Sequence, residues 1–191
     1  MNYIDIFTNL YKHRRVNISD KNTPFIQKFN RFIHQFIQLH QIITVIDLGC
    51  GEWISSYKAC EYLQNIEYIG YDAYKQTIDN HIQTYPQYEF VHIDFIEDRH
   101  IIEQGDLCII KDVFQYITNK DIQTILDYLI ESKKCKYIIM CNTFNQNWEN
   151  EDCSNHQYGR GLITHMFPLR KYKYTHLFYF NTKQVSLLQI Y

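Results

Sequence analysis

The sequence predicts an α/β fold in which a mostly parallel seven-stranded sheet carries helices on both faces and closes with a C-terminal β-hairpin. Three observations support this prediction. Short apolar, β-branched runs alternate with segments of helical periodicity between residues 42 and 141. The first of these runs ends at two glycines, as a strand followed by a tight turn would. Two β-rich runs near the C-terminus, 174–180 and 184–190, are separated by three polar residues, which is typical of a hairpin.

Residues 24–40 are predicted to form the first long helix. Thr23 and Pro24 favour a helix start, because threonine can accept a backbone N–H and proline fits the first helical turn. Six apolar residues fall on one face at helical spacing: Phe25, Phe29, Phe32, Ile33, Phe36 and Ile37. The pattern indicates an amphipathic helix.

The segments that follow alternate between strand and helix. The predicted strands are short and rich in β-branched residues: 42–48, 67–71, 88–93, 107–111 and 136–141. Helices are expected at 54–63, at 74–85 and after Thr118, where Thr118 to Asp121 matches a capping box and Ile117 is placed as a hydrophobic staple. Alternating strands and helices produce a parallel sheet, and the hairpin adds an antiparallel edge.

The length of 191 residues points to one compact domain. We divide it into an N-terminal helical cap, a core, an insert and the closing hairpin: 1–41, 42–141, 142–173 and 174–191. The insert has no clear period and is long for a connection, which is typical of a functional loop. No apolar run approaches the roughly 20 residues that a membrane helix needs, and the first residues do not resemble a signal peptide, so we expect a cytoplasmic protein.

Charge and cysteine content narrow the classes of ligand. The net charge is −2, from 19 basic and 21 acidic residues, which argues against a dedicated nucleic-acid binder and favours a small or neutral ligand. The six cysteines form no CxxC pair, so we interpret them as reduced core residues. His92 and Asp94 share one face of a strand, but two ligands do not make a metal site, and we predict no metal.

Polar residues follow the predicted strands at their carboxyl ends. Gly49 and Gly51 follow the first strand and allow a tight turn whose backbone N–H groups approach a ligand closely. Asp72 ends the second strand, about 20 residues later, where a carboxylate would hold a pair of ribose hydroxyls. Asp94 and Phe95 follow the third strand and offer an acceptor for an exocyclic amine and a ring to stack on a base.

Lys111 and Asp112 continue this pattern directly after the fourth strand. In open α/β sheets, ligands bind beyond the carboxyl ends of the strands, near the point where the strand order reverses. Each carboxylate alone could be a helix cap or a solvated turn. Because four consecutive strands end in polar groups, we expect one ligand site at this edge of the sheet.

The first motif distinguishes between cofactors. A nicotinamide-binding motif would carry a third glycine where Ile54 stands. Instead, residues 47–51 read acid-x-Gly-x-Gly and resemble the first motif of class I S-adenosylmethionine-dependent methyltransferases, which have a Rossmann-like fold. The resemblance runs from residue 42 to about 141. It is greatest to a subgroup of small bacterial-type methyltransferases. In that subgroup the stretches that correspond to residues 47–53, 68–72 and 111–117 of this sequence read approximately DLGCGDW, YIGVD and KDVLQHL.

The resemblance implies S-adenosyl-L-methionine as cofactor and assigns residues to its parts. Asp47, Gly49 and Gly51 would lie against the methionine part of the cofactor. Asp72 would bind the ribose hydroxyls.

The later motifs would complete the cofactor site. Asp94 would accept from the adenine amine with Phe95 beside it, and Lys111 would lie near the ligand through its backbone. Two residues depart from the family pattern. Trp53 replaces the third glycine of the broader family, a feature that the subgroup shares, and Tyr116 replaces the histidine of the fourth motif, so a mechanism that uses that histidine is excluded.

Methyl transfer to a hydroxyl or ammonium group also needs a group that can take a proton. Asp112 is the first candidate for this base, because it follows the fourth strand near the expected methyl position, although it could equally cap a helix. His165 and His156, both in the insert, come next, and His165 could equally be structural.

The insert suggests the acceptor. It places apolar rings among amides and hydroxyls, as at Asn147, Trp148 and Tyr158, and proteins recognise polar, hydroxylated ligands such as sugars in this way. We therefore expect a small polar acceptor, with a sugar or nucleotide-sugar hydroxyl or amine first. Two alternatives remain: an RNA or protein methyltransferase, which would need a basic stripe built from residues such as Arg160 and Arg170, and a non-catalytic binding module with the same fold.

Overall fold

The computed structural model describes residues 2–13, 23–56, 58–144, 152–153 and 160–191. One seven-stranded sheet has the order β3-β2-β1-β4-β5-β7-β6. Its first five strands in the sequence are parallel: β1 (Thr44–Leu48), β2 (Glu67–Asp72), β3 (Glu89–His92), β4 (Leu107–Lys111) and β5 (Tyr137–Thr143). The hairpin strands β6 (Thr175–Phe180) and β7 (Lys183–Gln189) are antiparallel, and β7 pairs with β5. The predicted fold class is confirmed.

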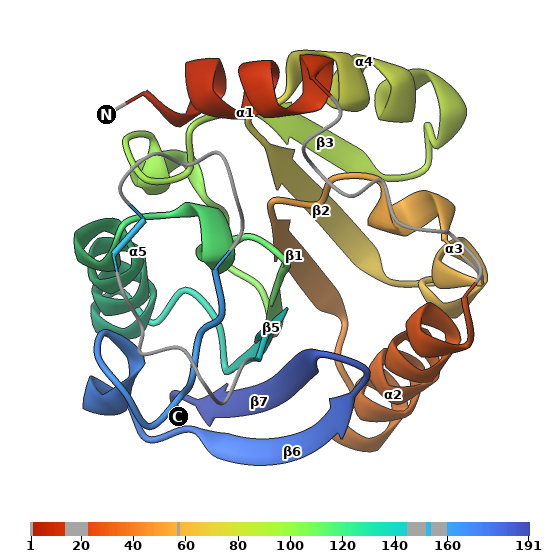
Figure 1. Cartoon of the computed structure of the whole chain (residues 1–191). Coiled ribbons are helices and arrows are strands. Elements are labelled where there is room, and N and C mark those ends of the chain that lie inside the picture. The colour runs from red at the N-terminus through yellow and green to blue at the C-terminus, as the bar shows by residue number, and fades with distance from the viewer. Residues whose placement is uncertain (1, 14–22, 57, 145–151, 154–159) are drawn as a thin grey trace.

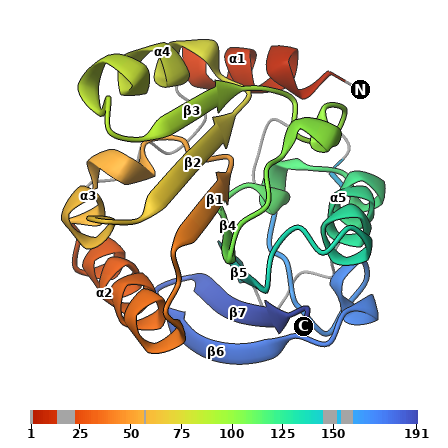
Figure 2. The ribbon, with the colours of Figure 1, turned by 180° about the vertical axis from the view of Figure 1, so that it is seen from behind.

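Helices cover both faces of the sheet (Figures 1 and 2). The α-helices are α1 (Tyr3–Lys12), α2 (Pro24–His40), α3 (Ala59–Tyr62), α4 (Lys75–Thr84) and α5 (Asn119–Glu131). Among the described residues, the short 3-10 helices are η1 (Trp53–Ser55), η2 (Arg99–Ile101), η3 (Phe114–Tyr116) and η4 (Leu169–Lys171). In the described part of the chain, no helix is long and apolar enough to cross a membrane.

The central strands β1 and β4 are buried on both faces, which explains their continuous apolar runs. Val45 and Ile109 belong to one core cluster, together with Phe29 of α2. Ile46 and Ile110 point to the opposite face and belong to a second cluster, together with residues of α5. Because side chains alternate along a strand, each central strand packs against a core on both faces of the sheet. Because the strands are parallel, their carboxyl ends lie at one edge of the sheet.

The predicted helix starts are present. The hydroxyl of Thr23 accepts from the backbone N–H of Ile26 at 3.3 Å at the start of α2. The hydroxyl of Thr118 accepts from the backbone N–H of Asp121 at 3.1 Å, as the capping box predicts, and Ile117 is buried beside it. Both helices therefore begin where local hydrogen-bond chemistry predicts that they should.

The helix predicted at 54–63 is wrong. The chain forms η1, then an extended residue at Ser56, and only then the short helix α3, which starts after Lys58 in a left-handed conformation with φ of 56°. A tertiary contact accompanies this break. Asn30 of α2 donates to the Ser56 hydroxyl at 2.9 Å and accepts from the Trp53 indole at 2.7 Å. The contact fixes the Trp53 side chain at the wall of the site described below.

Candidate functional site

A pocket of about 920 Å³, its open mouth included, lies at the carboxyl ends of β1, β2 and β4. Most of the predicted site residues line it: Asp47, Gly49, Gly51, Asp72, Phe95, Lys111 and Asp112. The strand order reverses between β1 and β4, so the pocket lies where ligands bind in open α/β sheets.

The glycine turn forms one wall of the pocket. Gly49 and Gly51 have φ angles of 77° and 46°, a backbone conformation that residues with a Cβ rarely adopt. Asp72 holds this turn through its carboxylate, which accepts from the backbone N–H of Gly51 at 2.9 Å and from that of Tyr74 at 2.7 Å. The Asp72 side chain is buried, and burial raises its pKa above the ordinary value. A Cβ on Gly51 would stand 3.1 Å from the Tyr11 hydroxyl, so the glycine keeps this space narrow but open.

Asp47 reaches the pocket from the end of β1 and is almost completely buried. Its carboxylate accepts a hydrogen bond from the Tyr68 hydroxyl at 2.7 Å. Burial raises the pKa of Asp47 to about 7, although the Tyr68 hydrogen bond and the Lys111 charge act in the opposite direction. The floor of the pocket therefore holds a carboxyl group that gains a full negative charge only above neutral pH, or when a cation binds beside it.

Helix α1 covers part of the pocket; it lies within the predicted N-terminal helical cap, although no helix was predicted for these particular residues. Phe7 and Tyr11 of this helix line the pocket, and the Tyr11 ring stacks on Tyr74 at a centroid distance of 4.3 Å. Figure 1 shows α1 running beside α4 at the end of the molecule opposite the hairpin. Asn2 caps α1, and apolar rings recur at positions 3, 7 and 11, so the helical signal was present in the sequence.

Asp94 does not line the pocket but anchors α1. One carboxylate oxygen accepts from the backbone N–H of Tyr3 at 2.7 Å, and the other accepts from that of Ile96 at 3.0 Å. Asp94 itself is buried. In this structure the acceptor that was expected to bind an adenine amine binds the N-terminal helix instead.

Asp94→Ala is expected to lower the free energy of unfolding by about 2–3 kcal/mol, because it leaves buried backbone donors without their charged acceptor. Urea denaturation measures this loss. Asp79→Ala, which removes an exposed carboxylate from α4, serves as the control. Equal stability of the Asp94 variant and the wild type would show that the contact with α1 contributes nothing.

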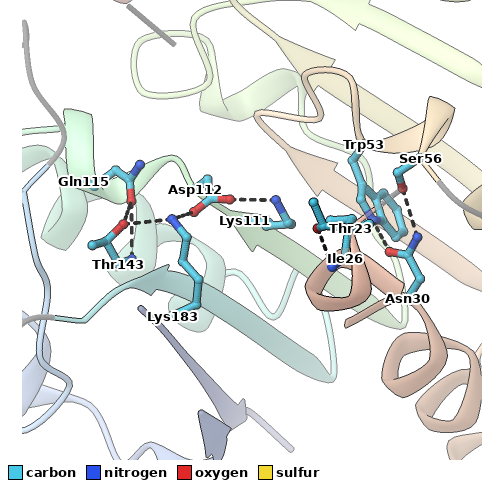
Figure 3. A network of polar contacts seen from close by, with 10 residues as sticks. All are labelled: Thr23, Ile26, Asn30, Trp53, Ser56, Lys111, Asp112, Gln115, Thr143 and Lys183. Carbon is cyan, nitrogen blue, oxygen red and sulfur yellow. Dashed lines mark hydrogen bonds and ion pairs between the residues drawn. The ribbon is translucent and has the colours of Figure 1, made fainter. Parts of the chain in front are cut away.

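Figure 3 shows an ion-pair network where β4 ends. The Lys111 ammonium contacts one oxygen of Asp112 at 2.6 Å, and the Lys183 ammonium contacts the other. Lys183 also donates to the Thr143 hydroxyl at 2.8 Å, which in turn donates to the Gln115 side chain at 2.7 Å. Burial alone would raise the pKa of Asp112, but the Lys111 and Lys183 charges outweigh it and hold the pKa below its ordinary value.

The insert contributes fewer site residues than expected. His165 is exposed and does not line the pocket. His156, Asn147, Trp148 and Tyr158 lie outside the described residues.

Arg160, the first residue proposed for a basic stripe, is buried. It donates to the Asn119 side chain and to the backbone carbonyl of Ile117, both at 2.7 Å. Asp152 accepts from the backbone N–H of Asn119 at 2.7 Å. These residues fasten the insert to the start of α5.

No protein-family model matches the sequence, and the curated proteins include no detectable relative. Solved structures share its fold. The methyltransferase domain of bacterial CtHen1 superposes with a TM-score of 0.61 at 13% identity, over 85% of this chain and 98% of that domain.

Two larger proteins superpose similarly. Human N-acetylserotonin methyltransferase, solved in complex with SAM, gives a TM-score of 0.65 at 16% identity over 97% of this chain and 59% of its own. The bifunctional kinase-methyltransferase WbdD gives 0.61 at 15% identity over 90% of this chain and 40% of its own. This chain thus spans less than two thirds of either of these two proteins. At such identities the likeness establishes the architecture alone: the chain has the Rossmann-like fold of these methyltransferases.

Proposed function

We propose that the protein is a methyltransferase that uses S-adenosyl-L-methionine and modifies a small polar acceptor, with a sugar or nucleotide-sugar hydroxyl or amine as the first candidate. One observation carries the proposal. A single pocket at the switch point of the sheet is lined by Asp47, by the two glycines that follow it in the acid-x-Gly-x-Gly motif, and by Asp72. The fold shared with known methyltransferases supports it.

The acidic groups of the pocket fit this cofactor. Asp47 and Asp72 are acidic and buried, and the cofactor carries a sulfonium and an ammonium group that would compensate their charge. In this proposal Asp72 binds the ribose hydroxyls, Asp47 and the glycine turn face the methionine part, and Phe95 lies beside the adenine. Asp94 would contact the adenine amine only after its hydrogen bond with Tyr3 is exchanged.

The cofactor supplies a methyl group on a positively charged sulfur, and the protein supplies orientation and electrostatics. Asp112 lines the pocket and is expected near the methyl group, but its two lysine partners make it a weak base. We therefore propose that Asp112 accepts a hydrogen bond from the acceptor and aligns it for attack. Among the histidines considered as bases, His165 is exposed and does not line the pocket in this structure.

S-adenosylhomocysteine is expected to stabilise the protein against heat, and NAD is not. At 100 times its dissociation constant a ligand adds about 2.7 kcal/mol to the free energy of unfolding. For a domain of this size the melting temperature rises by roughly 5–10 °C. A thermal-shift titration with both ligands makes the measurement. A shift with NAD alone, or with neither ligand, would contradict the proposed cofactor.

A further inference from the structure

The charged residues of the pocket are unevenly distributed about the switch point: one side is acidic, and the other side holds Lys111 beside Asp112. On the acidic side, Asp47 lies in β1, Asp72 ends β2 and Glu52 follows the glycine turn. Lys111 of β4 lines the pocket on the other side of the switch point, and Lys183 of β7 contacts Asp112 next to it. The acidic side matches the positive groups of the proposed cofactor, and the lysine side offers the opposite charge for an anion.

The backbone brings two ammonium groups to one carboxylate. Neighbouring side chains on a strand point to opposite faces, so Lys111 and Asp112 would not meet in a regular strand. Asp112 instead has a φ of 62°, which ends β4 and turns its carboxylate to within 2.6 Å of the Lys111 ammonium. A left-handed conformation at a residue other than glycine costs energy and is often kept for function. Lys183 reaches the same carboxylate from the hairpin.

These lysines are held in place and retain positive charge in excess. Their side chains are only 15% and 22% exposed, and Thr143 fixes Lys183 from a second direction. Two ammonium groups face one carboxylate, so these three side chains together carry a net charge of +1. Each ammonium has three N–H donors, and within the described residues Lys111 directs one of them to Asp112. An oxyanion placed here would satisfy both the charge and the remaining donors.

We propose that the methyl acceptor carries an oxyanion, a phosphate or a carboxylate group, that binds against Lys111 and Lys183. The assignment of this anion to the acceptor rests on the proposed methyl transfer. Lysine binds phosphate and carboxylate groups as a compact point charge. Asp112 orients the two lysines and limits the strength of anion binding, so that the acceptor is recognised by its anion and can still leave.

Inorganic phosphate and acetate test the subsite without knowledge of the rest of the acceptor. Calorimetric titrations at constant ionic strength use protein saturated with S-adenosylhomocysteine. We expect saturable binding of at least one anion, and the anion that binds more tightly distinguishes a phosphorylated from a carboxylated acceptor. Lys183→Met should weaken binding about tenfold or more, and Lys183→Arg should retain it. Lys171→Met, which removes a surface lysine paired with Asp127, should change nothing.

Asp112→Asn separates the proposal from a purely structural ion-pair cluster. Removing the competing negative charge should tighten anion binding about tenfold, the opposite sign to Lys183→Met. If both variants weaken binding equally, or if neither anion binds the wild type saturably, the subsite does not exist. The titration is also run on ligand-free protein, so that a failure of S-adenosylhomocysteine to bind counts against the proposed function and leaves the anion result to be judged separately.

Discussion

Asp47→Asn is expected to stabilise the ligand-free protein above pH 7 and to weaken its binding of S-adenosylhomocysteine. The pKa of Asp47 is raised from 3.8 to about 7 in the folded protein, because the side chain is removed from water. At 1.36 kcal/mol for each pKa unit, the ionised carboxylate costs the folded state on the order of 4 kcal/mol. Asparagine keeps an acceptor for the Tyr68 hydroxyl but buries an extra N–H donor, so we expect a net gain on the order of 2 kcal/mol.

The gain should depend on pH in a defined direction. Between about pH 4 and pH 7 the folded protein keeps a proton on Asp47 that the unfolded chain has lost, so the wild type loses stability as the pH rises through this range. Above the folded pKa the loss is complete. The stability difference between Asp47→Asn and the wild type should therefore grow from about pH 4 to about pH 7 and then level off.

Urea denaturation across this pH range measures the difference, and Asp79→Asn controls for the loss of one exposed negative charge. A difference that does not change with pH would contradict the raised pKa. In the bound state the ammonium of the methionine part would favour the ionised form of Asp47. We therefore expect calorimetry to show that the wild type binds S-adenosylhomocysteine more tightly as the pH rises toward neutrality. Asp47→Asn should bind about tenfold more weakly or worse at neutral pH.

Elements with strong local signals were predicted well from the sequence. The strand predicted at 107–111 coincides with β4, and the helix predicted at 24–40 coincides with α2. Both depend on periodicity and on end signals that neighbouring residues supply. The polar residues at the ends of β1, β2 and β4 also came together in one pocket, because parallel strands in one sheet necessarily end at the same edge, whereas Asp94 after β3 does not line it.

Features that depend on distant contacts were not predictable in this way. Nothing near Asp94 shows that its carboxylate binds the N-terminus of α1, which lies 91 residues earlier in the chain. Lys183 was assigned to the hairpin turn, and only the pairing of β7 with β5 brings it to Asp112. The break at Ser56 likewise accompanies a hydrogen bond from α2. In each case the tertiary fold brings together residues that are distant in the sequence, and local periodicity does not encode such contacts.

Asp72→Ala is expected to weaken S-adenosylhomocysteine binding by a hundredfold or more. The variant loses the charged acceptor proposed for the ribose hydroxyls, and hydrogen bonds to charged groups contribute about 1.5–3 kcal/mol each. It also releases the backbone N–H groups of Gly51 and Tyr74, which the carboxylate now holds. Calorimetric titration measures the affinity, and Asp79→Ala on α4 is the control. If Asp72→Ala bound S-adenosylhomocysteine with wild-type affinity, Asp72 would not belong to the cofactor site.

Asp72→Asn separates the two contributions of the carboxylate. Its amide oxygen can still accept from the backbone N–H of Gly51 and preserve the glycine turn, whereas it has no charge and only one acceptor oxygen for the ribose. If the turn alone mattered, the asparagine variant would recover most of the affinity that the alanine variant loses. If the ribose contact matters, as we expect, Asp72→Asn should stay within about tenfold of Asp72→Ala while its urea denaturation matches that of the wild type more closely.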